Sequence, residues 1–494
     1  MSNLIEFGKE YVMSIARNYF YNLILQISGI IIPFITVPYV TRVLDPQGVG
    51  IVSFTGSIVQ YFTLFAALGM SIYGSRTIAY IRNDREKINE TFWELFYIKL
   101  ITTLLTTVVY LIIVFAISAS YKVVYYVQSL NLIAVGFDIS YFFTGIEDFK
   151  KVSLRSIIIK IISVVAIFLF VKTANDYVLY ALISILGTLI GQVVLWAYLP
   201  EYIRIKKINY ANLREHLLGM FKLFVPMIAI EVYTVLDKTM IGLINNEAEV
   251  AYYDYAQRIV KMSLMLITSL GTVMIPRVSN LVSSGYKDQV DEYAKKVFDF
   301  YTYGSVFLMV AFLSTMPTFV PMFFGQKFLK VKDLIMVISP ILLFISWSNL
   351  FGMQLFVPFK LENFLTLSVV AGAVINFFLN LFLIPRYNSY GASIASVIAE
   401  FCVTLVQLLV VRKLIDVRYL FKGNWKHFVS GLITFLSVYL ITMNLNINLI
   451  LKLGIELVLL VVIYLGIEFL LKSEINLSVI NKALSTMKIR TIQQ

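Results

Sequence analysis

The stretch PQGVGIVSFTGSIVQYFTLFAALGMSIYGS, residues 46–75, contains no charged side chain. An α-helix rises about 1.5 Å per residue and the hydrocarbon core of a bilayer is about 30 Å thick, so this stretch can cross a membrane. Apolar runs of similar length recur along the whole 494-residue chain. The sequence therefore predicts an all-α polytopic membrane protein. A transmembrane barrel would show alternating segments of about ten residues instead.

The overall composition agrees with this interpretation and excludes several kinds of site. The chain is 59% hydrophobic and only 14% charged, which is too apolar for a soluble protein of this length. It holds a single cysteine, Cys402, and two histidines, His216 and His427. Because these residues are so few, we expect neither a disulfide framework nor a His/Cys metal centre, and no cofactor.

Hydropathy divides the chain into fourteen expected spans. Their ranges are 18–43, 50–75, 92–118, 124–144, 156–172, 176–199, 217–244, 250–276, 298–324, 334–357, 364–385, 389–411, 427–445 and 449–471.

The positions of Lys and Arg predict the orientation of these spans. With the N-terminus placed inside, 27 of the 41 basic residues fall in cytoplasmic segments and nine in or beside outer loops. Such an excess predicts that both termini are cytoplasmic. It also accounts for most of the net charge of +12, so we do not expect nucleic-acid binding.

Spans 1–6 and 7–12 resemble two copies of one unit. At an offset of 201 residues, VGIVSF (49–54) aligns with VAYYDY (250–255), and Arg76 aligns with Arg277. Because each copy has an even number of spans, both enter the membrane from the same side, as parallel repeats do. We expect an N-lobe at 1–200, a C-lobe at 201–424 around a shared central cavity, and two extra C-terminal helices at 425–494.

Four stretches resemble polysaccharide exporters of the superfamily that also contains the MATE drug exporters. They are TVPYVTRVLDPQGVGIVSFTGSIVQYF (36–62), DISYFFTGIEDFKKVSLRSIIIKIISVVAIF (138–168), LDKTMIGLINNEAEVAYYDYA (236–256) and NSYGASIASVIAE (388–400). The chain is most similar to Wzx-type flippases. One departure is Glu231, where the family pattern leads us to expect an uncharged polar residue.

This resemblance implies a function. Wzx-type flippases move undecaprenyl-diphosphate-linked oligosaccharide repeat units from the inner to the outer leaflet of the bacterial cytoplasmic membrane by alternating access. The implied partners are that lipid-linked substrate, the bilayer, and a polysaccharide polymerase with its chain-length machinery. The resemblance also suggests that spans 13–14 form a groove for the prenyl tail, although packing against lipid explains the same Leu- and Val-rich composition.

Cations within the spans are candidates for binding the diphosphate. Arginine pairs with phosphate oxygens through a planar fork, and lysine offers a point charge. Arg258 and Lys261 share a face of span 8, roughly 12 and 16 Å from its outer end, and Lys160 lies within span 5. Arg258 is alternatively expected to pair with Asp254, one turn earlier. We expect Lys99 to reach the cytoplasmic interface with its long side chain.

Among the carboxylates inside spans, three are singled out: Glu231, Asp237 and Glu400. They are candidates for coupling transport to a proton or a sodium ion, or alternatively for pairing with the intramembrane cations.

Three further cations are expected at the inner mouth of the cavity. Arg76 ends span 2, and a continuous helix from Gly50 would carry it roughly 39 Å, to the cytoplasmic face. Arg277 is its counterpart in the second copy, and Arg155 precedes span 5. These residues are either topology anchors or first contacts for the incoming diphosphate.

Other functions remain as alternatives. A drug or organic-cation exporter would have an acidic, aromatic cavity, whereas cations are at least as prominent here; a lipid II flippase would differ chiefly in its sugar-peptide head group. A polymerase or glycosyltransferase is disfavoured, because the sequence has neither a D-x-D motif nor a P-loop. The sequence therefore predicts a transporter rather than an enzyme.

Overall fold

The computed structural model describes residues 2–116, 121–206 and 208–475, in which all regular secondary structure is helical. Contacts divide the chain into two compact units, Met1–Ala251 and Tyr252–Gln494. Eleven helical segments of the described residues are long and apolar enough to cross a membrane. The chain is therefore an all-α, multi-pass membrane protein, as the sequence predicts.

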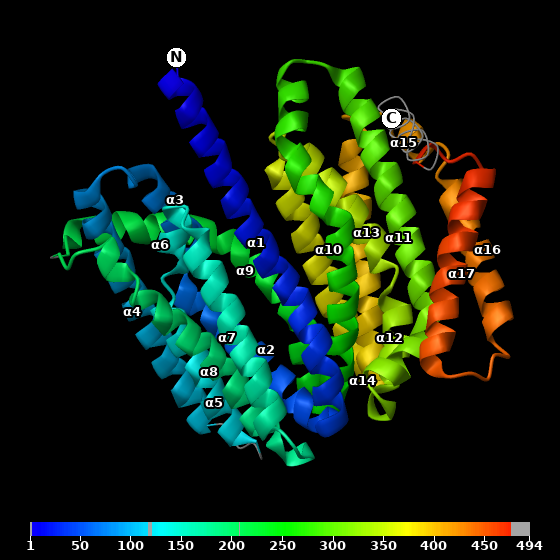
Figure 1. The fold of residues 1–494 in the computed structure, drawn as a ribbon, viewed down its shortest axis with the longest axis horizontal. Coiled ribbons are helices and arrows are strands. Elements are labelled where there is room, and N and C mark those ends of the chain that lie inside the picture. Colours follow the sequence, from blue (N-terminus) through cyan, green and yellow to red (C-terminus); the bar gives the residue numbers. More distant parts are fainter. Residues whose placement is uncertain (1, 117–120, 207, 476–494) are drawn as a thin grey trace. The chain divides into compact units, whose positions relative to one another are not determined.

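The described residues of unit 1 form the first nine α-helices and two short 3-10 helices. They are α1 (Ser2–Val43), α2 (Pro46–Ala67), α3 (Met70–Ile81), α4 (Arg85–Ala116), α5 (Lys122–Phe137), α6 (Ser140–Gly145), α7 (Phe149–Phe170), η1 (Ala174–Asp176), α8 (Tyr177–Trp196), η2 (Leu199–Glu201) and α9 (Tyr210–Ile244). Helices α2, α4, α5, α7 and α8 run side by side, and α1 packs along α7 (Figure 1). Their outward faces are rich in leucine, isoleucine and valine, as expected beside lipid.

Span 2 is not the continuous helix that the sequence predicts. Helix α2 ends at Ala67, because Leu68 and Gly69 both adopt left-handed backbone conformations, with φ of 44° and 73°. Gly69 tolerates this conformation without strain. Helix α3 then packs against α6 and α4. Arg76 therefore does not end one straight helix that begins at Gly50, and the expected distance of roughly 39 Å between them does not hold.

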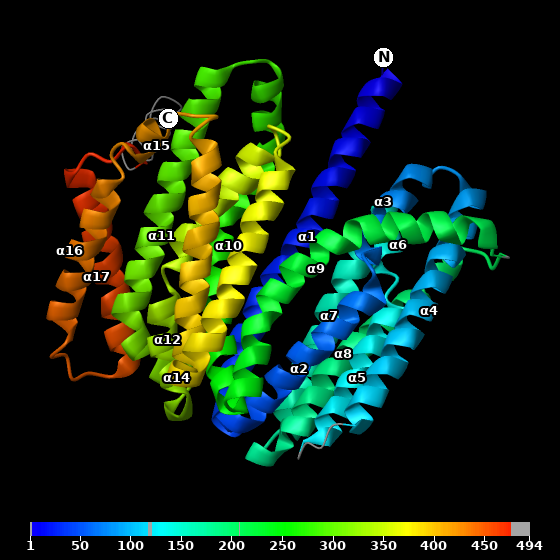
Figure 2. The same cartoon turned by 180° about the vertical axis from the view of Figure 1, so that it is seen from behind.

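A chain of buried polar groups fixes α9 within unit 1. His216 on α9 contacts the Tyr73 hydroxyl through Nδ1 at 2.9 Å and Glu94 through Nε2 at 3.1 Å. Asn212, one turn earlier on α9, donates to the other Glu94 oxygen at 2.9 Å. Figure 2 shows the first part of α9 lying across the ends of α3 and α6 before the helix turns along α2. The division by contacts thus falls after Ala251 rather than after residue 200, and the two six-span lobes stay a prediction.

Three loops of unit 1 meet at one end. Arg82 contacts Glu147 at 2.5 Å, Lys206 contacts Glu90 at 2.7 Å, and Lys151 is ion-paired with Glu201. These loops follow α3, α6 and α8, which end the expected spans 2, 4 and 6. Since successive spans cross the membrane in alternate directions, these three loops are expected at the same membrane face. We call this the basic end of unit 1.

Unit 2 begins inside α10 and contains the remaining helices. They are α10 (Glu247–Ser283), α11 (Lys287–Phe323), η3 (Gln326–Phe328), α12 (Lys330–Ile338), α13 (Ile341–Ser348), the π-helix η4 (Asn349–Phe356), α14 (Glu362–Val411), α15 (Val417–Phe421), α16 (Trp425–Thr442) and α17 (Leu449–Leu470). Helix α14 is two helices joined at a kink, where Asn388 has φ 54° and ψ −134°. This kink lies at the gap expected between spans 11 and 12.

The last two helices pack together and against α11 (Figure 1). The buried residues of α17 are Glu456, Leu460, Tyr464 and Glu468, spaced four apart. Thr318 donates to Glu456 at 2.8 Å, and His427 contacts Glu468 at 2.9 Å. The polar ends of this stripe thus hold α17 to α11 and α16.

The count of fourteen spans stays a prediction. The segment Glu362–Val411 counts once among the eleven but covers two expected spans, and α9 and α10, which match expected spans 7 and 8, are not among the eleven in the described residues.

Candidate functional site

The membrane helices α2, α5 and α8 of unit 1 line an open polar cavity of about 340 Å³. Its lining residues are Gly56, Val59, Gln60, Thr63, Gln128, Asn131, Ala134, Val135, Asp138, Thr188 and Gln192. Seven of these eleven side chains are polar, and four are carboxamides. Polar groups are costly inside membrane segments, and they mark binding surfaces or water-filled space.

Two cations lie around this cavity. Lys99 on α4 donates to the Asp138 backbone carbonyl, and its Nζ lies 3.8 Å from the Asp138 carboxylate. Arg155 on α7 donates to the Gln192 side-chain oxygen at 2.9 Å and to the Gly191 carbonyl on α8. Asp138 and Gln192 both line the cavity, so each cation is one contact away from it.

The burial of Lys99 differs from the prediction. The sequence led us to expect that its ammonium group would reach the membrane interface, but only 2% of its surface is exposed. The Asp138 carboxylate and carbonyl provide its partners, and the Tyr141 ring centroid lies 5.5 Å from Nζ. Because these partners come from the turn between α5 and α6, the pair also ties α4 to that turn.

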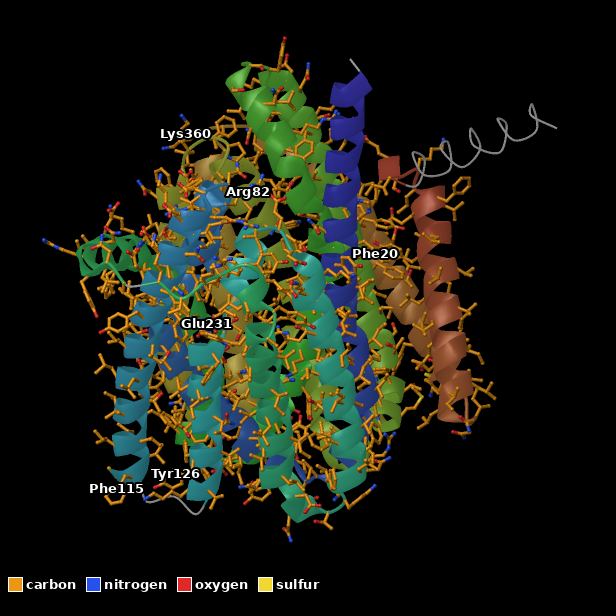
Figure 3. The ribbon with its side chains drawn as sticks, turned by 60° about the vertical axis from the view of Figure 1, so that its left-hand side comes forward. Phe20, Arg82, Phe115, Tyr126, Glu231 and Lys360 are labelled. Atoms are coloured by element: carbon orange, nitrogen blue, oxygen red, sulfur yellow. The ribbon has the colours of Figure 1, made fainter. Side chains whose placement is uncertain are left out.

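The carboxylates predicted on α9 are held within unit 1. Glu231 is half-buried and accepts from the Gln60 side chain, which itself lines the polar cavity. Figure 3 shows Glu231 between the end that carries Arg82 and the end that carries Phe115 and Tyr126. Asp237, two turns later, is buried.

Of the remaining cations predicted in unit 1, Lys160 is half-buried near the middle of α7, and Arg76 is exposed on α3 with its guanidinium 5.8 Å from the Tyr73 ring centroid. Arg155, predicted at the inner mouth, contacts Gly191 and Gln192 of α8, and its place at the inner mouth stays a prediction.

In unit 2, Arg258 forms the ion pair that was the alternative expectation. Its Nε and Nη2 donate to Asp254 Oδ2 at 3.1 and 2.8 Å. The Asp254 side chain is almost buried, whereas half of the Arg258 side chain is exposed. Lys261, one turn later on α10, is also exposed.

The other two predicted residues of unit 2 lie at separate places. Arg277 is exposed in the last part of α10. Glu400 is half-buried on α14, where its backbone carbonyl accepts from Thr404 at 2.9 Å. On α10, Tyr253 contacts Ser396 of α14 at 2.9 Å, a buried hydroxyl pair that joins these two helices.

The part of the chain that the structure describes holds no group of three or more His, Cys, Asp or Glu side chains suited to a metal ion. What the arrangement offers is polar recognition inside a membrane: carboxamides and a carboxylate in a cavity, with cations one contact away. The sequence prediction missed Gln60, Gln128, Asn131 and Gln192. Each is a carboxamide within an otherwise apolar run, a signal that marks each residue singly as a polar group inside a span but not the grouping of the four.

Comparison with known families decides the relationship. Residues 15–282, more than half of the chain, match the family described as polysaccharide biosynthesis protein. The chain belongs to this family.

Individual relatives agree with the polysaccharide biosynthesis family. A protein of Escherichia coli K12 named "Putative O-antigen transporter" is 23% identical over 404 residues, which cover 81% of this chain and 97% of that protein. A Shigella dysenteriae protein of the same name is 22% identical, over 77% of this chain and 96% of its own length.

Solved structures show the same fold. The lipid II flippase MurJ, in an inward closed conformation, matches 92% of this chain and all of the MurJ chain, with a TM-score of 0.76 and 15% sequence identity. An inward-facing multidrug transporter of the MATE family, in the MOP superfamily, matches 80% of this chain and 94% of its own, with a TM-score of 0.57 and 14% identity. The all-α, MATE-like transporter fold expected from the sequence is thereby confirmed.

Proposed function

We propose that this member of the polysaccharide biosynthesis family flips undecaprenyl-diphosphate-linked oligosaccharides from the inner to the outer leaflet of the bacterial cytoplasmic membrane. The observation that carries the proposal is the match to two O-antigen transporters over nearly their whole length. The product would feed assembly of a capsule, exopolysaccharide or other surface polysaccharide. The chain acts as a transporter, not as an enzyme, with both termini in the cytoplasm.

The polar cavity of unit 1 supports this proposal. A sugar diphosphate cannot cross hydrocarbon while hydrated, so the protein has to replace water around its hydroxyl and phosphate groups. Carboxamides suit hydroxyl groups because each has two donors and two lone pairs. The Arg155 contact uses only the Gln192 oxygen, and the NH₂ group of Gln192 retains its donors.

Arg258, Lys261 and Lys160 are the proposed diphosphate ligands. Arg258 and Lys261 share a face of α10, and both have exposed side chains. Cations within membrane helices usually face a cavity or a partner rather than lipid tails, because contact with lipid tails is costly. Arg76, Arg277 and Arg155 are the proposed cations of the inner mouth.

Ion coupling is proposed for Glu231, Asp237 or Glu400. Glu231 has the strongest support, because its partner Gln60 lines the polar cavity. A proton or sodium ion at Glu231 would change the charge beside that cavity. A polysaccharide polymerase and chain-length machinery are the proposed protein partners.

Transport of lipid II is the second candidate, because the MurJ fold matches nearly the whole chain. That similarity is one of fold alone, whereas the O-antigen transporters share detectable sequence. A MATE-like drug exporter is supported only by a weaker match of fold.

The test is complementation. The chain is expressed in a strain that lacks its O-antigen flippase, in a strain depleted of MurJ, and in a drug-sensitive strain without its exporters. We expect surface polysaccharide to return in the first strain, and lipid-linked repeat units to stop accumulating in its inner leaflet. Rescue of the MurJ-depleted strain alone, or drug resistance alone, would overturn the proposal in favour of the corresponding alternative.

A further inference from the structure

A second cavity, of about 430 Å³, opens between α7 and α8 at the basic end of unit 1. Three cations line it: Lys150, Lys151 and Arg155. Asp148 is the only carboxylate among the residues that the structure places in its lining. Asp148 and Glu201 both lie beside Lys151, so Lys150 and Arg155 give the cavity its net positive charge, which suits an anion.

The wall on the membrane side is apolar. Leu154, Ile158, Ile159 and Val194 form it, and Leu154 and Ile158 are each about half exposed. The exposed strip continues along α7 through Ile161, Ile162 and Val165. An exposed isoleucine-rich strip on a membrane helix faces lipid tails. The cavity is thus cationic at the end of the helices and apolar toward the membrane interior.

The cations at the rim are held in place by neighbouring groups. Lys151 is ion-paired with Glu201, donates to the Tyr202 hydroxyl at 3.0 Å, and lies 5.0 Å from the Tyr198 ring centroid. Arg155 is fixed by Gln192 and by the Gly191 carbonyl. Side chains that are already ordered lose less conformational entropy when a ligand binds.

We propose that this cavity binds an anionic glycerophospholipid of the bilayer. Its phosphate contacts Lys150, Lys151 and Arg155, and one acyl chain lies along Leu154 and Ile158. Basic pockets between membrane helices on the cytoplasmic side suit such head groups. The apolar wall selects a lipid over a free phosphate ion, because only a lipid covers Leu154 and Ile158. The site shares Arg155 with the proposed inner mouth, but Lys150 and Lys151, the two cations changed in the test below, have no part in the transport function proposed above.

The test is native mass spectrometry of the full-length protein, delipidated in detergent and titrated with phosphatidylglycerol. The variant is Lys150→Gln/Lys151→Gln. Its matched control is Lys87→Gln/Lys206→Gln, which removes two exposed, ion-paired lysines of the same basic end outside the cavity. Near a membrane each basic residue contributes about 1 kcal/mol toward an anionic lipid, so we expect bound lipid to fall about tenfold or more in the variant only.

A second variant tests the apolar wall without changing charge. Val194→Trp fills the cavity from α8, and we expect it to reduce lipid binding while the melting temperature stays within a few degrees. Equal lipid binding by the wild type, the double variant and the control would overturn the proposal.

Two competition arms identify the ligand. Displacement of phosphatidylglycerol by millimolar inorganic phosphate would show a simple anion site and overturn the assignment. Displacement by undecaprenyl phosphate at a tenfold lower concentration would assign the site to a prenyl-linked substrate and overturn it as well. We expect neither competitor to displace the phospholipid.

Discussion

Lys99 in unit 1 and Arg258 in unit 2 are both cations on helices expected to cross the membrane, and each pairs with an aspartate. They differ in what surrounds the cation. Lys99 is almost fully buried, whereas half of the Arg258 side chain is exposed and its partner Asp254 is the buried member. In the first pair the cation is enclosed by protein while Asp138 also lines the polar cavity, and in the second the carboxylate is enclosed while the cation is half exposed.

This difference separates two uses of charge in a membrane. A pair with an enclosed cation stabilises the fold, since removing its partner leaves the cation buried without compensation. A pair with an exposed cation can bind an anion and still keep its carboxylate partner. We therefore expect substitutions of Lys99 to act on stability and substitutions at Arg258 to act on transport.

The largest effect is expected from Arg258→Gln/Lys261→Gln. If both cations bind the diphosphate, the variant loses two charge-assisted contacts of about 1.5–3 kcal/mol each, and transport falls about 100-fold or more. Export of lipid-linked repeat units measures it, with insertion checked by membrane fractionation.

The matched control for that variant is Lys296→Gln, which removes an exposed lysine paired with Glu292 on α11. Transport by this control should match the wild type. Undiminished polymer export by the double variant would remove Arg258 and Lys261 from the proposed site.

The next effect is expected from Lys99→Met. The change keeps the length of the side chain but removes the cation that contacts Asp138, which keeps its Ser140 backbone donor and part of its exposure, so we expect a cost of about 1–3 kcal/mol in the free energy of unfolding. Thermal unfolding in detergent measures the loss, with Lys222→Met, an exposed lysine on α9, as control. Adding Asp138→Asn to Lys99→Met should restore part of the stability, and no restoration would contradict the role given to the pair.

A smaller effect is expected from Asn131→Leu in the polar cavity. Leucine has a similar volume but cannot donate or accept, so transport should fall several-fold with little change in melting temperature. Ser129→Ala on the same helix is the control, because the Ser129 hydroxyl bonds only its own helix, at the Tyr126 carbonyl. Equal transport by both variants would mean that the cavity does not contact the substrate.

The smallest effect is expected from Asp84→Asn. Asp84 is an exposed loop carboxylate, and it differs from the two cation–aspartate pairs because backbone N–H groups are its main partners. The backbone N–H of Lys87 donates to Asp84 and lowers the pKa of this carboxyl group. Its stabilisation is therefore present above the unfolded-state pKa and is lost as the pH falls through the folded-state pKa. The melting temperatures of variant and wild type should differ slightly near about pH 7 and converge toward about pH 3. A gap that widens on acidification would contradict this assignment.

The sequence alone predicts those features of the fold that depend on a single helix. Each span needs its own apolar run, so hydropathy located most helices and placed the interruption of α14 beside Asn388. It was insufficient where partners come from distant segments. Asp138 lies 39 positions from Lys99, and His216 lies 122 from Glu94, and no local pattern states these distances.

The bend after α2 was missed for a related reason. The run from Pro46 to Ser75 is uniformly uncharged, so hydropathy gives no sign of the left-handed turn at Leu68 and Gly69. For the candidate site, the Arg258–Asp254 pair could be predicted because it lies within one helix turn. The cavity could not, because its carboxamides come from three helices.

The buried row of α17, from Glu456 to Glu468, determines how this helix packs against α11 and α16. Residues spaced four apart drift around an α-helix, so Glu456 and Glu468 lie about 120° apart around its axis. Sliding α17 by one turn would place Leu460 opposite Thr318 and bring a carboxylate against an apolar surface. The two acids therefore fix both the axial register and the rotation of α17. The exposed residues Leu457, Val461 and Leu465 consequently face outward in one fixed direction. A prenyl chain bound along these exposed residues would meet a surface of fixed orientation.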